Sequence, residues 1–223
     1  RNEPLVEITQ IKGTSETHPA LSTTDEWANF ELMEFRVATR LPSKPEGSYV
    51  RDALLRGLAL EAQGITNPYK FGVIGSSDTH TGAAQNDESD FSSKLGILSA
   101  DAQLRGAVPF GTVDGLLFNT LAPQAMTEVD GEIFIGGASP TYGASGLAGV
   151  WAEANTRESI YAAFQRKETF ATSGPRMRLR FFAGYEFPHD LMDLADGVAR
   201  AYATGVTMGA DLAADLSNAP TGG

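Results

Sequence analysis

Residues 71–82 combine a short apolar run with a polar end, and this segment constrains the fold more than any other part of the chain. Its first residues, 71–74, predict a buried strand. Because side chains alternate along a strand, Asp78 and His80 are expected to point the same way. A carboxylate and an imidazole at the carboxyl end of a buried strand are suited to binding a metal ion. The same two residues also fit a simpler role, in which a hydrogen bond between them stiffens a loop.

The composition of the 223 residues limits the partners of the chain. Its formal net charge is −11, which argues against nucleic acid or an anionic membrane as the main partner. A small anionic substrate stays compatible with this charge, because a metal ion can reverse the sign locally. There is no cysteine, so any metal must be held by His, Asp, Glu or water. No apolar run has the length of a membrane span.

The hydrophobic pattern predicts the order strand, loop, helix, strand in the first third of the chain. Residues 5–11 alternate as a strand does, and apolar residues recur at helical spacing over 49–63, with Ser48 as the expected N-cap. A second helix is expected over 157–167, with Thr156 as its N-cap. This order is typical of an α/β fold with a parallel sheet.

The remaining segments are less regular. Residues 94–130 show no clear periodicity, whereas 177–187 and 199–208 resemble half-buried strands. We therefore expect two parts, an α/β unit over 1–176 and a β-rich appendage over 177–223. The chain has no initial methionine and ends in a Pro- and Gly-containing segment, from which we expect a fragment trimmed at both ends. The sequence gives no indication of the oligomeric state.

Three acidic or imidazole side chains near the start of the chain are further candidates. Glu7 lies within an apolar strand, where burial is costly unless the carboxylate is paired or bound to a metal. The alternative is an edge strand that leaves Glu7 in water. Glu16 and His18 follow in a polar loop that can turn both toward one site. Such a pair is more often found at the surface than on a metal.

A hydroxyl-rich turn follows the second predicted helix. Thr172, Ser173 and Arg176 lie directly after a short apolar strand. Hydroxyl groups and a forked guanidinium are suited to binding an oxyanion. The alternative is a tight turn with an arginine on the surface.

Several longer motifs, taken together, resemble a known family and cover nearly the whole chain. The similarity is to the family called domain of unknown function 3604, which is related to the PHP (polymerase and histidinol phosphatase) metallohydrolases. The motifs that carry the resemblance are residues 6–8, 10–16, 25–31, 67–72, 75–81, 146–152 and 171–176.

The resemblance implies a distorted, here partial, β/α barrel with a cluster of divalent ions (Zn, Mn or Fe) at the carboxyl ends of its strands. Asp78 and His80 match its Asp-x-His ligand motif, and Glu7 matches a ligand by its position in a strand. Glu16 and His18 are weaker matches. The resemblance also implies hydrolysis of phosphate esters and a periplasmic or secreted location.

One departure from the family bears on the metal site. The family has a His-x-His motif at its start, whereas the histidines here are His18, His80 and His189. The metal site within this chain is therefore expected to be incomplete.

The sequence thus predicts part of a metal-dependent phosphoesterase that uses a metal-activated hydroxide. Arg176 is expected to neutralise charge on the phosphoryl group, and Thr172 and Ser173 to bind the substrate. Two alternatives stay open, a sulfate-ester hydrolase and a non-catalytic module that binds carbohydrate or protein on a hydrolase scaffold.

Overall fold

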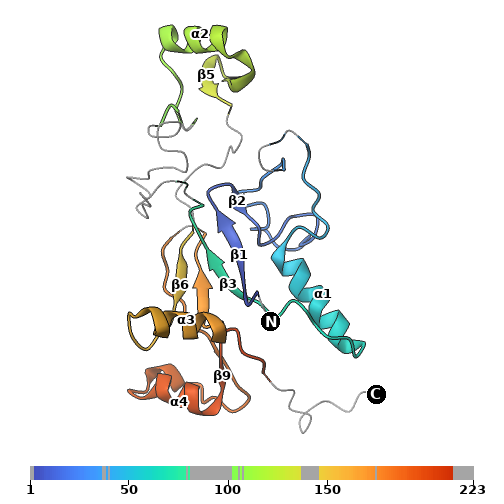
Figure 1. Cartoon of the computed structure of the whole chain (residues 1–223), viewed down its shortest axis with the longest axis vertical. Helices are drawn as coiled ribbons and strands as arrows, with labels where there is room; N and C mark the ends of the chain where they lie inside the picture. Colours follow the sequence, from blue (N-terminus) through green and yellow to red (C-terminus); the bar gives the residue numbers. More distant parts are fainter. Residues whose placement is uncertain are drawn as a thin grey trace.

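A computed structural model describes residues 3–36, 39, 41–78, 80, 102–104, 106, 108–136, 146–173 and 175–212. Within these residues the fold is mixed α/β, with short strands in small sheets (Figure 1). The helices are α1 (Val50–Ala62), α2 (Thr112–Leu121), η3 (Pro123–Ala125), α3 (Arg157–Arg166), η4 (Leu191–Asp193) and α4 (Gly197–Thr204). The strands are β1 (Leu5–Gln10), β2 (Gly13–Thr14), β3 (Gly72–Gly75), β4 (Met126–Val129), β5 (Glu132–Ile135), β6 (Ala148–Val150), β7 (Thr169–Ala171), β8 (Phe182–Ala183) and β9 (Val206–Thr207).

The sheet that organises the fold has the strand order β2-β1-β3. β1 and β3 are parallel, with Val6 opposite Val73, and α1 provides the crossover between them. The predicted order of strand, helix and strand is therefore confirmed. β7 lies beside β3 on the side away from β1, and β6 pairs with β7 in the antiparallel sense (Figure 1).

Glycine permits β6 and β7 to approach the end of β3. A Cβ added to Gly146 would lie 1.7 Å from the backbone oxygen of Thr172 and 2.4 Å from Cγ2 of Thr9. A Cβ on Gly75 would lie 3.0 Å from the same two atoms. Only hydrogen fits at Gly146 without displacing its neighbours, so this residue fixes how the strands meet.

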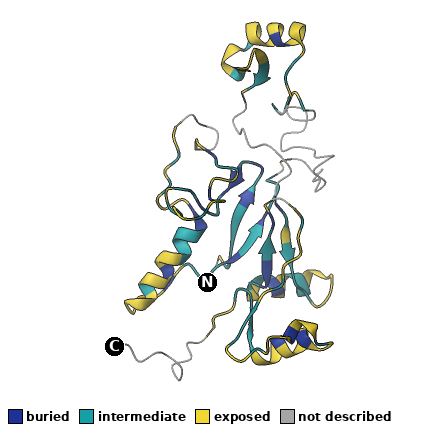
Figure 2. Ribbon diagram, turned by 180° about the vertical axis from the view of Figure 1, so that it is seen from behind, coloured by how far each residue is buried: buried dark blue, intermediate teal, exposed yellow. Residues whose placement is uncertain are grey.

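The barrel implied by the family resemblance is not observed in the described residues. Their strands form one sheet of three strands and three pairs, and these do not close on one another. Strands β1, β3 and β7 are buried or half-buried, whereas much of α1, α2 and α4 is exposed (Figure 2). None of the helices in the described ranges has the length and apolar character that a membrane span requires.

Within its described residues, 177–212, the segment expected to be a β-rich appendage contains less β structure than the sequence predicts. The strand expected over 199–208 is wrong, because α4 extends to Thr204 and only Val206–Thr207 forms a strand. The physical reason is the spacing of Val198, Ala201 and Tyr202, which places them on one helix face, with Ala201 fully buried. Of the strand expected over 177–187, only Phe182–Ala183 forms.

The two predicted helices begin close to where the sequence indicates. Thr156 caps α3, since its side chain accepts a hydrogen bond of 3.3 Å from the amide of Ser159. Ser48, however, is not the cap of α1. The cap is Tyr49, and the amides of Val50 and Arg51 donate to the backbone of the loop after β2. The loop backbone therefore replaces the expected side-chain cap.

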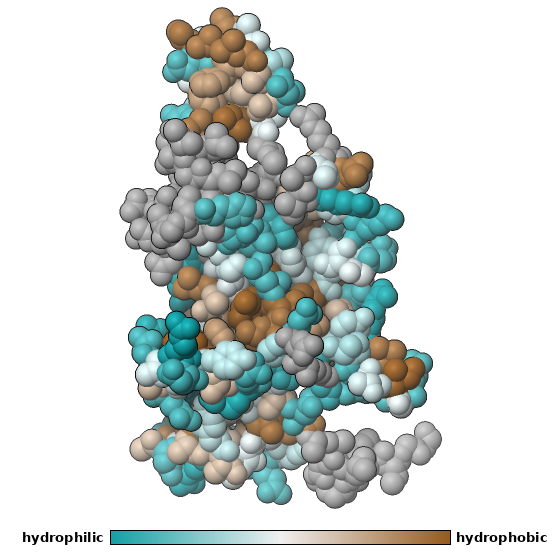
Figure 3. Space-filling model, viewed as in Figure 1, coloured by the Kyte–Doolittle hydropathy of each residue, from teal (hydrophilic) through white to brown (hydrophobic). Residues whose placement is uncertain are grey.

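The segment that contains α2, β4 and β5 is a local unit in which the helix packs against the β-hairpin. The outer face of α2 is apolar (Figure 3). Val113, for example, is 80% exposed and Leu121 is 71% exposed. The sequence did not predict this unit, because its apolar residues lack a clear period.

Replacing Gly146 by Ala should destabilise the protein by about 1–3 kcal/mol, because the new methyl group must displace Thr172 or Thr9. Gly111→Ala is the matched control, since nothing lies within 4 Å of its added Cβ and its φ is −60°. The control should change stability by no more than about 0.5 kcal/mol. Urea denaturation of both variants measures the difference. Equal stability of the two variants would show that the strands do not meet as described.

Candidate functional site

Polar side chains gather where β1, β3 and β7 end. The three strands run in the same direction, so their carboxyl ends lie at one edge (Figure 1). Residues 11–16 follow β1, residues 76–80 follow β3 and residues 172–176 follow β7. Carboxyl ends of parallel strands are where α/β proteins place their functional groups.

Glu7 lies on the central strand of its sheet, so the edge-strand interpretation is wrong. Its carboxylate accepts hydrogen bonds from Ser76 Oγ (2.5 Å, to Oε2) and Gln10 Nε2 (2.8 Å, to Oε1). The register between β1 and β3 shifts between Glu7 and Thr9, and such a bulge re-aims nearby side chains. These hydrogen bonds hold the half-buried carboxylate against the loop that carries Asp78.

Asp78 and His80 lie close together, although not through the strand alternation from which the sequence analysis expected them to point the same way. His80 Nε2 lies 3.4 Å from Asp78 Oδ1, and the side chains are 54% and 30% exposed. The strand ends before them, at Gly75, so strand alternation is not the cause. Instead Asp78 adopts a left-handed backbone conformation with φ of +46°, which Asp tolerates better than most residues. The backbone conformation of Asp78 therefore directs the chain out of the strand direction before His80.

Lys12 is a member of this edge to which the sequence analysis assigned no role. Its Nζ donates a hydrogen bond of 2.8 Å to Ser15 Oγ. Burial lowers the pKa of Lys12, while the carboxylates of Glu7 and Asp78 act in the opposite direction. One cation and two carboxylates thus share the edge. The sequence did hold a signal for this role of Lys12: the lysine lies two residues after a strand that contains a glutamate.

Glu16 and His18 have other contacts in the structure. Arg51, on α1, donates to Glu16 Oε1 from Nε (3.2 Å) and from Nη2. The same guanidinium donates to Asp25 at 2.5 Å and holds the pKa of that carboxyl below its usual range.

His18 Nδ1 accepts a hydrogen bond of 3.1 Å from the amide of Ala20, and the imidazole packs on Tyr49 with 5.5 Å between ring centroids. Neither Glu16 nor His18 is shown in contact with Asp78 or His80. A metal-binding role for Glu16 and His18 stays a prediction.

The predicted oxyanion-binding residues follow β7. Thr172 is buried, and its Oγ1 accepts a hydrogen bond of 3.1 Å from the amide of Leu147. Arg176 Nη1 lies 3.5 Å from the same Oγ1. Thr172 and the exposed Ser173 also line a cavity of about 360 Å³, together with Phe30 and other mainly apolar residues. The hydroxyl group of Thr172 therefore lies next to both the guanidinium group of Arg176 and the apolar side chains of the cavity.

The donors at this edge fit a divalent ion in part. Carboxylate and imidazole suit zinc, manganese and iron, so Asp78 and His80 can supply two ligands. In the part of the chain that the structure describes, no three residues of the types His, Cys, Asp and Glu are placed to hold one ion. A metal-binding role for Asp78 and His80 therefore stays a prediction.

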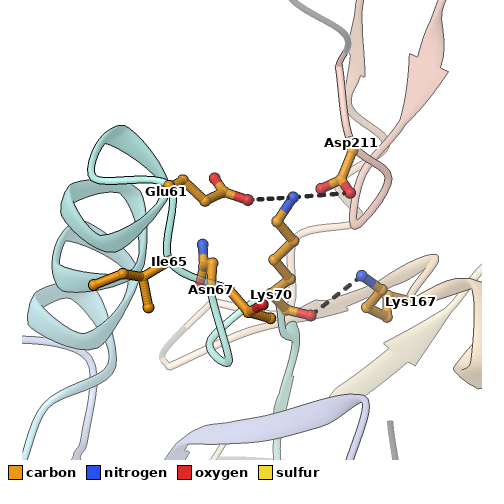
Figure 4. A pocket seen from close by; sticks show the side chains of 8 residues that line it. Glu61, Ile65, Asn67, Lys70, Lys167 and Asp211 are labelled. Carbon is orange, nitrogen blue, oxygen red and sulfur yellow. Dashed lines mark hydrogen bonds and ion pairs between the residues drawn. The ribbon is translucent and has the colours of Figure 1, made fainter.

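A cavity of about 610 Å³ lies near the opposite edge, before β3 and β7 (Figure 4). Lys70 Nζ extends between Glu61 (2.6 Å) and Asp211 (3.0 Å), which raise its pKa. Lys167 Nζ donates to the backbone oxygen of Lys70 at 3.2 Å. Both lysines therefore serve to join α1, the α3–β7 turn and the segment after β9.

The chain matches the family model described as "Protein of unknown function (DUF3604)" over residues 1–221. It belongs to the DUF3604 family. No curated protein and no solved structure matches the chain. The family description assigns no activity to DUF3604 proteins, so the function must be argued from the residues of this edge.

Lys12 should titrate below the ordinary lysine range, and Glu7→Gln should lower its pKa further because a stabilising carboxylate is lost. Lys70 should titrate above that range. The measurement is NMR of ¹³C-labelled lysine side chains in EDTA-treated protein, with Lys12→Met and Lys70→Met for assignment.

The depressed pKa of Lys12 also fixes the sign of its effect on stability. Below both pKa values the charged lysine carries a burial penalty in the folded state. That penalty disappears as the pH rises from the folded-state pKa to the unfolded-state pKa, because the unfolded chain binds more protons in this window. A Lys12 that titrates like Lys70 would contradict the described burial.

Proposed function

We propose that this DUF3604 protein contributes to the active site of a metal-dependent hydrolase of anionic esters, with phosphate monoesters or diesters as substrates. The observation that carries the proposal is the Asp78–His80 pair, which lies at the carboxyl edge beside Glu7 and Lys12. The resemblance to the PHP metallohydrolases supports the same chemistry. The periplasmic or secreted location rests on the resemblance alone and stays a prediction.

Each residue of the edge has a role in this proposal. Asp78 and His80 would hold a divalent ion, and Glu7, which Ser76 and Gln10 orient, would complete or support that shell. A divalent ion in this place supplies an activated water and a counter-charge for the ester oxygens.

Arg176 would neutralise charge that develops on the phosphoryl group, as predicted, and the hydroxyls of Thr172 and Ser173 would hydrogen-bond its oxygens. Arg176 already lies beside Thr172, so the two groups can bind one anion together. The ammonium of Lys12 offsets the carboxylates, which would otherwise repel an anionic substrate.

A sulfate ester would present the same tetrahedral oxyanion, so a panel of both esters belongs to the test. A non-catalytic binding module is the second candidate. It is favoured by the absence, among the described residues, of a grouping of three metal-binding side chains.

The double replacement of Asp78 and His80 by Ala should abolish metal uptake by the protein produced at the length that its gene encodes. Loss of two ligands costs an ion most of its affinity, since each contributes directly to the bond. Elemental analysis after dialysis against zinc, manganese or iron(II) measures bound metal per chain.

Asp52→Ala with His189→Ala is the matched control, because it removes the same two groups at other places. Unchanged metal content in the Asp78 and His80 variant would contradict the assignment of these ligands. If the unmodified protein binds no metal and hydrolyses neither phosphate nor sulfate esters, the binding module is the better account.

A further inference from the structure

A cavity of about 420 Å³ lies between the end of β2 and the start of α1. Lys12 lines it from the β1–β2 turn, Arg36 and Lys44 from the long loop that precedes α1, and Tyr49 from the start of the helix. Lys12 belongs both to this cavity and to the edge that carries Glu7 and Asp78. We call it the cationic cavity after its three basic residues.

The charge of the cationic cavity is opposite to that of the whole protein. The chain has 28 acidic and 17 basic residues, yet three basic side chains and a single acidic one, Glu46, line this space. No ion pair to Arg36 or Lys44 is present among the residues that the structure describes. In the cavity of Figure 4, by contrast, Lys70 is held between two carboxylates. Arg36 and Lys44 thus keep positive charge for a ligand.

Apart from Glu46, the remaining polar side chains of the cationic cavity carry hydroxyl groups, which can donate hydrogen bonds to an anion. Five hydroxyl residues line it, namely Thr14, Ser15, Ser43, Ser48 and Tyr49, and that of Ser43 already donates to the backbone oxygen of Met33 at 2.9 Å. Because Ser15 Oγ accepts its hydrogen bond from Lys12, the hydrogen of its own hydroxyl stays available for donation to an anion. The amino-terminal end of α1, with its positive dipole, also borders the space.

We propose that the cationic cavity binds a phosphate group that is not the one hydrolysed. This inference rests on the proposed function, and it narrows the substrates to esters that carry a second phosphate group apart from the reacting one. Lys12 lies both at the cationic cavity and at the edge that carries Asp78. A second phosphate group bound in the cavity would therefore position the reacting ester at Asp78 and His80. The volume of the cavity is sufficient for a phosphate group and part of the molecule that bears it.

Isothermal titration of pyrophosphate and of inorganic phosphate into EDTA-treated protein tests the cavity without reference to catalysis. The double variant Arg36→Gln with Lys44→Gln should weaken pyrophosphate binding by about tenfold or more, because two charge-assisted hydrogen bonds are lost. The matched control is Arg56→Gln with Arg200→Gln, which removes two positive charges from exposed helix surfaces. The control should change the dissociation constant by less than about twofold.

The outcomes separate this inference from the proposed function. Asp78→Ala should bind pyrophosphate at least as tightly as the unmodified protein does, since the cavity does not require the metal and a carboxylate near Lys12 is removed. Equal weakening by the cavity variant and the control, or loss of binding only in Asp78→Ala, would overturn the inference and leave the hydrolase proposal intact.

A kinetic comparison applies where hydrolysis is observed. Glucose 1,6-bisphosphate should then have a lower KM than glucose 1-phosphate, and the cavity variant should remove that difference. Equal KM values in the unmodified protein would also overturn the inference.

Discussion

The parallel pairing of β1 with β3 decides where the polar side chains of this protein meet. Parallel strands place their carboxyl ends at one edge, and here that edge receives Glu7 from β1 and Asp78 from the turn after β3. The glycines at 75 and 146 extend the arrangement, because they permit the end of β7 to lie against the end of β3. Thr172 reaches the same edge only through this close contact.

The sequence predicted the elements of this sheet better than the contacts of its side chains. Alternation and helical spacing are local signals, and they located β1, α1 and β3 to within one residue or so. The hairpin β4–β5 was missed although Asp130 and Gly131, both with positive φ, form a typical two-residue turn. The turn could therefore have been recognised from the sequence. The two strands were not predicted because the apolar residues around the turn show no clear periodicity.

Long-range partners explain why some candidate residues were not brought together. Glu16 meets Arg51, a residue 35 positions later, and this pairing draws Glu16 toward the start of α1. His18 packs on Tyr49 for the same reason, since the loop after β2 docks on that end of the helix. No spacing within the loop could indicate a partner on another element. Asp78 and His80, by contrast, are two positions apart in the sequence, so no partner on another element is needed to place one near the other.

Lys12 connects these observations, because its ammonium faces two kinds of surroundings. On one side are the carboxylates of Glu7 and Asp78, and on the other is the cationic cavity with Arg36 and Lys44. A protein with a net charge of −11 repels anions over most of its surface. Concentrating cations in one cavity beside the carboxylates lowers that repulsion locally, and a divalent ion at Asp78 and His80 would lower it further. The two proposals therefore depend on one electrostatic condition, that this edge attracts an anion which the rest of the chain repels.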